Sequence, residues 1–373
     1  MRRPTPDSVT FRLATAEDAA VETFDNTKLT AGATCPTWGI TRYQMHKTVA
    51  QSSRAMALEC GSVMHDAFAM IRLVQLLHDF NNIAGRDPAI GKALFQFHGL
   101  RMFKQERLMQ ILEQASGNGE FSPSDNVKIY ATRAAVAVLE TSDYYDDPSD
   151  KKRTIANMED SLFAYVSKWD WKQPIWVRDI TDPTSDVGIE IPFDLLVTWQ
   201  FGDAVKQRRF TGKIDGIRVV NGVVRLEENK TASRLNEAWS QPFYLNSQPT
   251  GYMMAASVFS GETIRQARIM GLCIPLPKSY DAGGYLEFTV HRTDNHITDW
   301  LRWFDFIASS VYEDFAYNPS EAPRFTHSCG RYFRPCSMIP FCDVDEAEQK
   351  LMLDEMITEE WSPLADEGEK AND

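Results

Sequence analysis

Residues 213–230 read KIDGIRVVNGVVRLEENK, in which Asn221-Gly222 separates two runs rich in β-branched residues. An Asn-Gly pair between two such runs is the strongest short signal for a β-hairpin with a two-residue turn. A two-residue turn fixes the pairing of the strands, so that Asp215 falls directly opposite Glu228. The stretch therefore predicts a hairpin that carries two carboxylates on one face near its open end.

The facing carboxylates require a positive partner. Directly opposed residues of a sheet have Cβ atoms about 5 Å apart, and two like charges at that spacing destabilise the pair. A divalent cation such as Mg²⁺ or Mn²⁺ removes this repulsion. Lys230 lies two residues beyond Glu228 on the same face, where it is placed to hold or activate an attacking water. The competing interpretation is an exposed hairpin end at which Lys230 merely forms an ion pair with Glu228. A shifted strand register would also place Glu227, rather than Glu228, near Asp215.

The net negative charge of the chain is concentrated at its C-terminus. The 373 residues carry a formal net charge of −13. From Asp343 onward there are 12 acidic and 2 basic residues, which leaves about −3 on the body of the chain. Because phosphate neutralisation supplies much of the affinity of proteins for DNA, the body rather than the tail is compatible with a nucleic-acid partner. We expect disorder from Asp354 to Asp373, and the tail is a candidate for autoinhibition by DNA mimicry or for binding a protein partner.

The remainder of the chain divides into a helical part and a strand-rich part. Helical spacing of apolar residues predicts helices from about Gln44 to Val166. Strands are predicted at Val187–Gln200, Arg209–Val220, Val223–Thr231, Ile264–Ile274 and Tyr285–His291, and further helices at Gln248–Phe259 and Ile297–Phe315. The expected organisation is an N-terminal segment (1–43), a helical subdomain (44–180), a core (181–318), a cysteine segment (319–342) and an acidic tail (343–373). The N-terminus lacks an apolar signal region and no run of 18 apolar residues occurs, so we expect a soluble, cytoplasmic protein.

Four short motifs follow one another along the chain. They are Gly61-Ser-Val-Met-His65, Gly212-Lys-Ile-Asp215, Glu228-Asn-Lys230 and Gln248-Pro-Thr-Gly-Tyr252. In this order they resemble the GxxxH, GxxD, ExK and QxxxY motifs of the RecB-like branch of the PD-(D/E)XK nucleases, which includes AddB and the iron-sulfur CRISPR-associated exonucleases. Each motif alone occurs by chance, so the resemblance depends on their order and on the hairpin register.

The resemblance implies an α+β (α/β) fold with a restriction-endonuclease-like core, in which helices flank a central mixed β-sheet and a helical subdomain precedes the core. It also implies roles for individual residues. His65, Asp215, Glu228 and the carbonyl of Asn229 would hold Mg²⁺ or Mn²⁺, with Asp215, Glu228 and Lys230 as the catalytic set. Gln248 and Tyr252 would contact DNA, and Glu190 resembles an additional acidic residue that some members carry.

The six cysteines are too sparse for a disulfide scaffold. Cys35 precedes the GxxxH motif, whereas Cys329, Cys336 and Cys342 follow the core as C-x6-C-x5-C. The iron-sulfur members of the family divide their cysteines in the same way and bind a 4Fe-4S cluster, which would join the two chain ends here. The family's usual C-x2-C-x5-C spacing is shorter than this one, so structural Zn²⁺ and unligated buried cysteines remain alternatives. Cys60 and Cys273 are interpreted as packing residues.

The function that these features predict is metal-dependent exonucleolytic hydrolysis of single-stranded DNA or DNA ends. Two alternatives remain: a nuclease-fold factor that binds DNA or protein without cutting, and a structure-specific endonuclease with structural zinc. Residues 85–93 resemble a phosphate-binding loop but have one residue too many between the glycines and no hydroxyl residue after Lys92, so no ATP site is expected. Trp300, Trp303 and Phe304 could stack on bases, but their helical spacing favours a core position.

Overall fold

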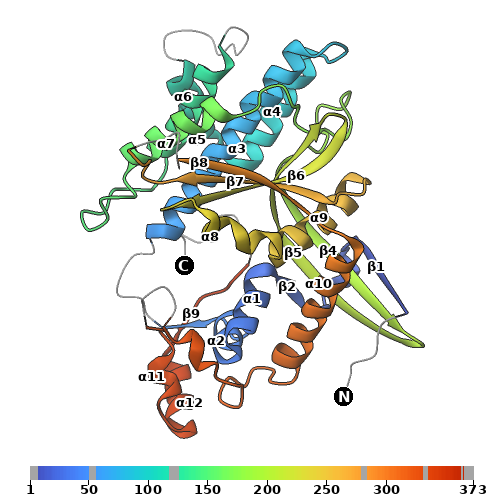
Figure 1. The fold of residues 1–373 in the computed structure, drawn as a ribbon, viewed down its shortest axis with the longest axis vertical. Helices are drawn as coiled ribbons and strands as arrows, with labels where there is room; N and C mark the ends of the chain where they lie inside the picture. The colour runs from blue at the N-terminus through green and yellow to red at the C-terminus, as the bar shows by residue number, and fades with distance from the viewer. Residues whose placement is uncertain are drawn as a thin grey trace. The chain divides into compact units, whose positions relative to one another are not determined.

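The fold is known from a computed structural model, which describes residues 7–49, 56–116, 126–278, 284–330, 335–362 and 364. It is a mixed α+β structure in which helices flank a mostly antiparallel sheet (Figure 1). This part of the fold prediction is confirmed. None of the described helices is both long enough and apolar enough to cross a membrane.

The elements follow one another along the chain with a helical stretch between two groups of strands. The strands are β1 (Ser8–Leu13), β2 (Thr23–Asp25), β3 (Lys47–Thr48), β4 (Ile189–Phe201), β5 (Ala204–Val220), β6 (Val223–Ala232), β7 (Gln266–Cys273), β8 (Tyr285–His291) and β9 (Ile357–Thr358). The α-helices are α1 (Asn26–Thr34), α2 (Pro36–Tyr43), α3 (Met56–Asn82), α4 (Pro88–Met102), α5 (Gln105–Ser116), α6 (Val127–Glu140), α7 (Ile155–Lys168), α8 (Glu237–Ser240), α9 (Ser247–Ser260), α10 (Asp294–Ile307), α11 (Ile339–Cys342) and α12 (Glu346–Glu355). Short 3-10 turns and one π-helical turn, η4 (Ala308–Glu313), complete the set.

The chain forms two compact units, each of which is assembled from separate parts of the sequence. The first unit comprises Met1–Arg54, Pro192–Lys213 and Thr293–Asp373, and the second comprises Ala55–Ile191 and Ile214–Arg292. The chain passes between them within β4 and within β5. The sequence had suggested consecutive segments instead, because hydrophobic patterns identify elements but not which distant elements pack together.

The predicted hairpin is the centre of the second unit. Its register is confirmed from Val220 opposite Val223 as far as Gly216 opposite Glu227. The turn residue Asn221 has a φ of 52° and Gly222 a φ of 78°, as a two-residue turn of type I′ requires. Because the turn is local in sequence, its chemistry alone sets the register of both strands.

The second unit has helices on both faces of its strands. Within it, β6 pairs antiparallel with β5 and parallel with β7, and β7 pairs antiparallel with β8. In Figure 1, α3 to α7 lie on one side of β6–β8, and α8 and α9 lie on the other. Two consecutive residues of β7 face opposite helical layers. The sulfur of Met270 lies near Tyr165 of α7, whereas Gly271 lies against Trp239 of α8.

The 27-residue helix α3 forms the middle of the helical layer. Most of its residues between Val63 and Phe80 are buried, because α4 and α6 pack beside it and the sheet lies beneath it. Apolar side chains on all of its faces explain why its buried stripe is wider than that of a surface helix. The predicted helical region is confirmed over α3–α7, but it begins too early, since Lys47–Thr48 form the short strand β3.

The first unit contains elements that the sequence patterns did not reveal. Strand β1 pairs with β4, β2 pairs with β5, and Asp25 caps α1 by accepting hydrogen bonds from the main chain of Thr27 and Lys28. Aromatic rings from several elements meet beneath α10, where Trp300 and Phe304 are buried against Phe210. Their interpretation as core residues is thus confirmed.

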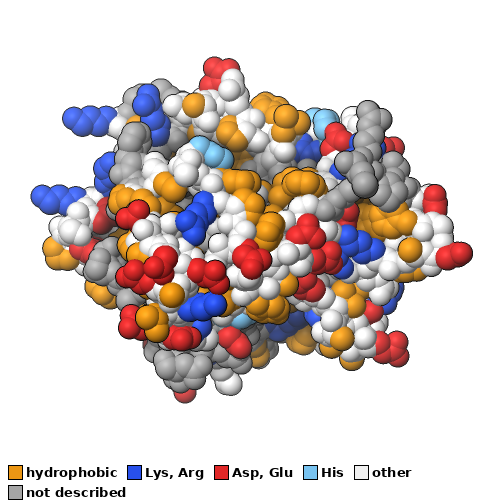
Figure 2. Space-filling model, turned by 90° about the horizontal axis from the view of Figure 1, so that it is seen from below, with side chains coloured by type: hydrophobic (Ala, Val, Ile, Leu, Met, Phe, Trp, Pro, Cys, Tyr) orange, Lys and Arg blue, Asp and Glu red, His pale blue; other side chains and the backbone are white. Residues whose placement is uncertain are grey.

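The acidic tail is folded over its first part. Helix α12 is capped by Asp345, and β9 pairs with β3. Beyond β9, Glu359 forms an ion pair with Arg42 at 2.8 Å, and the indole N–H of Trp361 donates to Asp25 at 2.7 Å. The prediction of disorder is therefore wrong for residues 354–362, which end α12, pair with β3 and form these side-chain contacts, and residues 363 and 365–373 lie outside the described part. On the face drawn in Figure 2, acidic and basic side chains are interspersed with apolar ones.

Candidate metal centre

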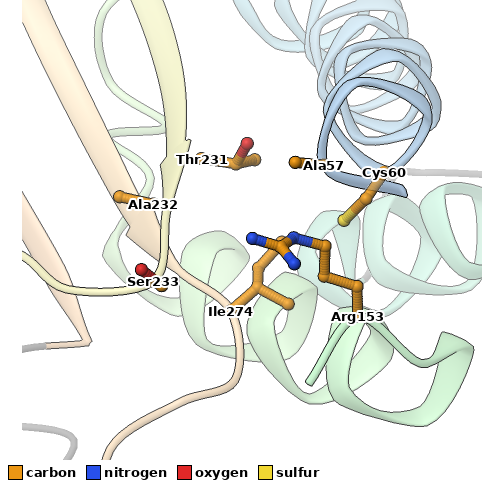
Figure 3. Close-up of a pocket in the computed structure, with 7 residues that line it drawn as sticks. All are labelled: Ala57, Cys60, Arg153, Thr231, Ala232, Ser233 and Ile274. Carbon is orange, nitrogen blue, oxygen red and sulfur yellow. The ribbon is translucent and has the colours of Figure 1, made fainter. Parts of the chain in front are cut away.

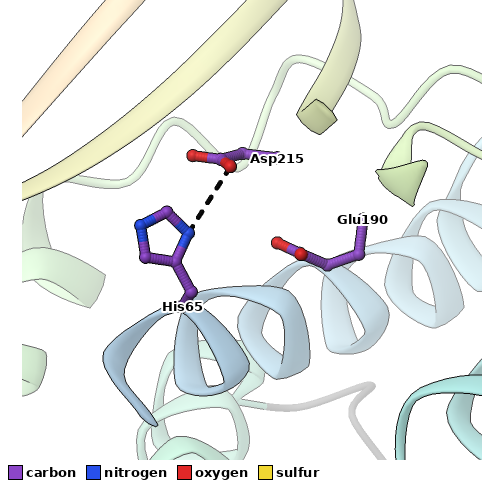
Figure 4. A group of neighbouring side chains, drawn as sticks. All are labelled: His65, Glu190 and Asp215. Carbon is purple, nitrogen blue, oxygen red and sulfur yellow. Dashed lines mark ion pairs between the residues drawn. The ribbon is translucent and has the colours of Figure 1, made fainter. Parts of the chain in front are cut away.

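The candidate site begins where the hairpin ladder ends. The last paired residues are Gly216 and Glu227. One residue further, the carboxylate Oδ2 of Asp215 accepts a hydrogen bond from the main-chain N–H of Asn229 at 2.7 Å. A side chain thus replaces a main-chain acceptor at the point where the two strands separate. Asp215 is buried, and its second oxygen, Oδ1, is directed toward α3 (Figure 4).

Helix α3 contributes His65 to the site. The Nδ1 atom of His65 lies 3.4 Å from Oδ1 of Asp215, and the imidazole retains 28 % of its side-chain exposure. The GxxxH and GxxD motifs, 150 residues apart in the sequence, therefore meet at these two side chains. The imidazole is thus partly accessible to a ligand from solution, whereas the carboxylate beside it is buried.

Strand β4 contributes Glu190. One ligand atom each from His65, Glu190 and Asp215 lie within 4.8 Å of one another, and Figure 4 shows the three side chains directed toward a common point. Glu190 has a φ of 45°, a backbone conformation that costs a non-glycine residue of order 1 kcal/mol or more and is concentrated at functional sites. Among the described residues, the candidate ligand group therefore consists of His65, Glu190 and Asp215, and Glu228 is not part of it.

Glu228 and Lys230 form the neighbouring part of the site. Nζ of Lys230 donates to Oε1 of Glu228 at 2.5 Å. Glu228 is fully buried, and within the described residues its Oε2 atom has no hydrogen-bond partner. The pairing that the competing interpretation predicted is therefore present, but on a buried glutamate rather than at an exposed hairpin end.

Burial and charge shift the protonation of these groups in opposite directions. Burial raises the pKa of Glu228 to about 7, because the nearby Lys230 offsets the loss of solvent only in part and Asp215 repels a second negative charge. Burial also opposes the charged form of Asp215, but His65 and Lys230 outweigh it and hold the pKa of Asp215 below its usual range. The pKa of His65 is raised despite burial because Asp215 and Glu190 stabilise the imidazolium.

A buried polar network that sequence reasoning missed supports Asn229. With its amide oxygen toward α3, Asn229 accepts from both terminal nitrogens of Arg72 at 2.7 and 3.0 Å and donates to the hydroxyl of Tyr165 at 2.9 Å. Gly216 leaves room for this arginine, since a Cβ there would lie 2.7 Å from Nε of Arg72. Arg72 lies two helical turns beyond His65 on the same face of α3, and that spacing is the signal that could have identified it. The predicted role of the Asn229 carbonyl stays a prediction.

The QxxxY motif lies on α9 as predicted. Helix α9 packs against β6 and β7. Tyr252 is buried, and Gln248 is half-buried in the first turn, where its main-chain N–H donates to the capping side chain of Asn246. Contact of Gln248 and Tyr252 with DNA remains a prediction.

The four cysteines of the predicted cluster lie in the first unit. Cys35 caps α2, whose first residue is Pro36, and Cys342 ends α11. Burial raises the pKa of both Cys336 and Cys342, and charge on Cys35 and Cys329 would raise the pKa of both thiols further. None of the six cysteines is in a disulfide.

Two hydrogen bonds shape the cysteine segment. The N–H of Cys336 donates to the carbonyl of Cys329 at 2.8 Å, and the N–H of Met338 donates to the sulfur of Cys336 at 3.4 Å. The packing interpretation of the other two thiols is confirmed, since Cys60 and Cys273 are buried.

Comparison of the chain with protein-family models gives no match, and comparison with curated proteins gives none either. Functional inference consequently depends on the residues and geometry of the site.

Proposed function

We propose that this protein is a metal-dependent nuclease of the PD-(D/E)XK type that hydrolyses phosphodiester bonds in single-stranded DNA or at DNA ends, as an exonuclease. The observation that carries the proposal is the meeting of His65, Glu190 and Asp215 where the hairpin strands separate. A buried glutamate paired with a lysine lies beside them on the next strand.

The donor set fits a small, hard cation. Mg²⁺ holds its ligands at about 2.1 Å, which places opposite ligands roughly 4.2 Å apart, and the three ligand atoms lie within 4.8 Å of one another. Two carboxylates and one imidazole suit Mg²⁺ or Mn²⁺. The free Oε2 atom of the buried Glu228 is an unsatisfied acceptor of the kind that a cation or its bound water relieves.

The chain's own residues supply the other requirements of hydrolysis. Bound Mg²⁺ or Mn²⁺ would lower the pKa of a water molecule and offset charge on the phosphate. The ammonium group of Lys230, held by Glu228, orients the attacking water and stabilises negative charge that develops on the phosphate. The main chain of Asn229 fixes the Asp215 carboxylate, so the ligand does not have to reorganise during the reaction.

Metal binding is the first testable consequence of this proposal. Calorimetric titration with Mn²⁺ is expected to show binding to the wild-type protein and an affinity at least tenfold lower in Glu190→Gln, because the substitution removes one anionic ligand. His65→Ala is expected to behave in the same way. The exposed Glu237, at the start of α8, provides the matched control, and Glu237→Gln should bind as the wild type does. Equal affinity of all four proteins would contradict the assignment of the ligands.

We also propose that Cys35, Cys329, Cys336 and Cys342 hold a structural 4Fe-4S cluster. An amide N–H that donates to a cysteine sulfur, as between Met338 and Cys336, is typical of the surroundings of such clusters. Four thiolates on one zinc ion lie about 3.8 Å apart, whereas within the described residues no three of these sulfurs lie within 4.8 Å of one another. A cluster of four irons and four sulfides is larger than a single ion and does not require so close a spacing of the sulfurs.

Metal analysis distinguishes the two cofactors. Protein purified without oxygen is expected to be brown, to contain about four irons per chain and to lose its visible absorption in Cys336→Ser. Cys273→Ser, which changes a buried cysteine of the second unit, should keep the colour. A colourless protein that contains one zinc ion would contradict the cluster and support structural zinc instead.

A further inference from the structure

A pocket lies between the start of α3 and the end of β6, within the second unit. Its cavity volume is about 70 Å³, and Figure 3 shows the guanidinium of one arginine directed into it. Its lining residues are Ala57, Cys60, Arg153, Thr231, Ala232, Ser233 and Ile274. The pocket thus combines one cation and two hydroxyl groups with apolar walls.

The pocket adjoins the candidate metal centre along two elements. On β6, Thr231 directly follows Lys230, so its side chain lies on the opposite face of the strand, where its hydroxyl oxygen would be 3.8 Å from a Cβ placed on Gly61 of α3. On α3, Cys60 precedes His65 by five residues, which corresponds to about 7.5 Å along the helix axis.

The loop before α7 holds Arg153 in position. Asp150 accepts hydrogen bonds from the main chain of Lys152 and Arg153 and forms an ion pair with Nη1 of Arg153 at 2.6 Å. The hydroxyl of Tyr144 donates to the carbonyl of Arg153, and Asn157 donates to the carbonyl of Lys152 at 2.8 Å. The guanidinium is therefore presented by an ordered loop, and its side chain retains 30 % exposure.

The groups in the pocket are available as donors to an anion. In the described part of the chain, Nη1 is the only nitrogen of the Arg153 side chain that donates to protein, so that Nη2 and Nε are available. The hydroxyls of Thr231 and Ser233 have no hydrogen-bond partner among the described residues. Burial raises the pKa of Cys60 to about 11, which leaves its thiol uncharged at neutral pH. Asp150, the ion-pair partner of Arg153, supplies a negative charge but does not line the pocket.

We propose that this pocket binds the phosphate next to the scissile one on the DNA strand, with Arg153 as the charged donor and Thr231 and Ser233 as neutral donors. The proposal rests on the proposed nuclease function. A planar guanidinium with two free N–H edges matches the geometry of a phosphate group, and the apolar wall formed by Ala57 and Ile274 matches a deoxyribose. Arg153 is thus a substrate-positioning residue that determines where the strand lies relative to Asp215.

The test measures binding of a fluorescent single strand by anisotropy, in the Asp215→Asn background so that the strand is not cut. Adding Arg153→Ala is expected to weaken binding about tenfold, because a hydrogen-bonded charge pair is lost. The slope of log affinity against log salt should decrease by about 0.7, the value for one phosphate on a single strand. Ser233→Ala, at an exposed position, should weaken binding two- to threefold with the salt slope unchanged.

Two controls separate the pocket from general electrostatics. Arg302 also pairs with an aspartate three residues away, Asp299, and is largely exposed, so Arg302→Ala is expected to keep both the affinity and the salt slope. Arg153→Lys keeps the charge and the ion pair with Asp150, and it should recover the slope but only part of the affinity.

Neutralising one phosphate at a time locates the contact. A methylphosphonate at the position next to the scissile phosphate is expected to weaken binding by the same factor as Arg153→Ala, and combining the two changes should cost no more than either alone. The proposed phosphate contact would be wrong if the two effects were additive at every position, or if Arg153→Ala bound with wild-type affinity and salt slope. Either result would leave the nuclease proposal intact. If no variant binds the strand, and the wild type cuts none, the proposed function itself fails.

Discussion

Replacing Asp215 with Asn is expected to reduce DNA hydrolysis by about a thousandfold or more, which corresponds to roughly 4 kcal/mol of lost transition-state stabilisation. The change removes a negative ligand from the group formed with His65 and Glu190. It preserves the side-chain oxygen that accepts the hydrogen bond from Asn229, so the strands should keep their arrangement. The measurement is the release of labelled nucleotides from 5′- and 3′-labelled single strands in the presence of Mn²⁺, which also shows the direction of cutting.

The control for this experiment is a second buried aspartate of the same unit. Asp79 is also buried, and its carboxylate accepts from the main chain of Ile175 at 3.0 Å, but it belongs to no candidate ligand group. Asp79→Asn should therefore cut at nearly the wild-type rate. Lys230→Met is expected to be as inactive as Asp215→Asn while still binding Mn²⁺. Unchanged cutting by Asp215→Asn, or comparable losses in Asp79→Asn, would exclude the proposed site.

The hairpin could be predicted from sequence because its determinants are local. Asn221 and Gly222 adopt positive φ values at little cost, and the turn they form fixes every pair as far as Gly216 and Glu227. Counting residues along the two strands from the turn then places Asp215 near Glu228. The elements of the first unit were not predictable in this way, since β1 and β2 find their partners in strands almost 190 residues away.

Glu190 illustrates what local reasoning could not establish. Its sequence context reads as an ordinary strand, and its left-handed backbone conformation depends on tertiary contacts around β4 and β5. It was therefore expected only as an additional acidic residue, whereas the structure brings it into ligand distance of His65 and Asp215. Glu228 was expected to be a direct metal ligand. It lies instead beside the group of His65, Glu190 and Asp215, and it accepts a hydrogen bond from Lys230.

The second large effect is expected at Glu227, on the opposite face of β6 from Glu228. Its carboxylate is fully buried between three guanidinium groups: Arg268 at 3.3 Å, Arg218 at 3.4 Å and Arg72 at 3.7 Å. From the sequence, Glu227 was expected at the site only as the substitute for Glu228 in a shifted register, because a run of two glutamates does not reveal which of them faces the arginines. Among the described residues, its carboxylate is the one that forms ion pairs with both Arg72 and Arg218.

Glu227→Gln should therefore destabilise the second unit by about 3–5 kcal/mol, the cost of leaving buried charges without a partner. Urea unfolding followed by tryptophan fluorescence measures the change, since Trp169 lies over the guanidinium groups of Arg72 and Arg218. Glu287 provides the control because it pairs with Arg268 from the exposed rim, and Glu287→Gln should cost less than about 1 kcal/mol. Similar losses in both variants would mean that the buried network contributes no more than a surface pair. A large loss in Glu227→Gln alone would instead show that Arg72, and with it the support of Asn229 and Asp215, depends on this one carboxylate.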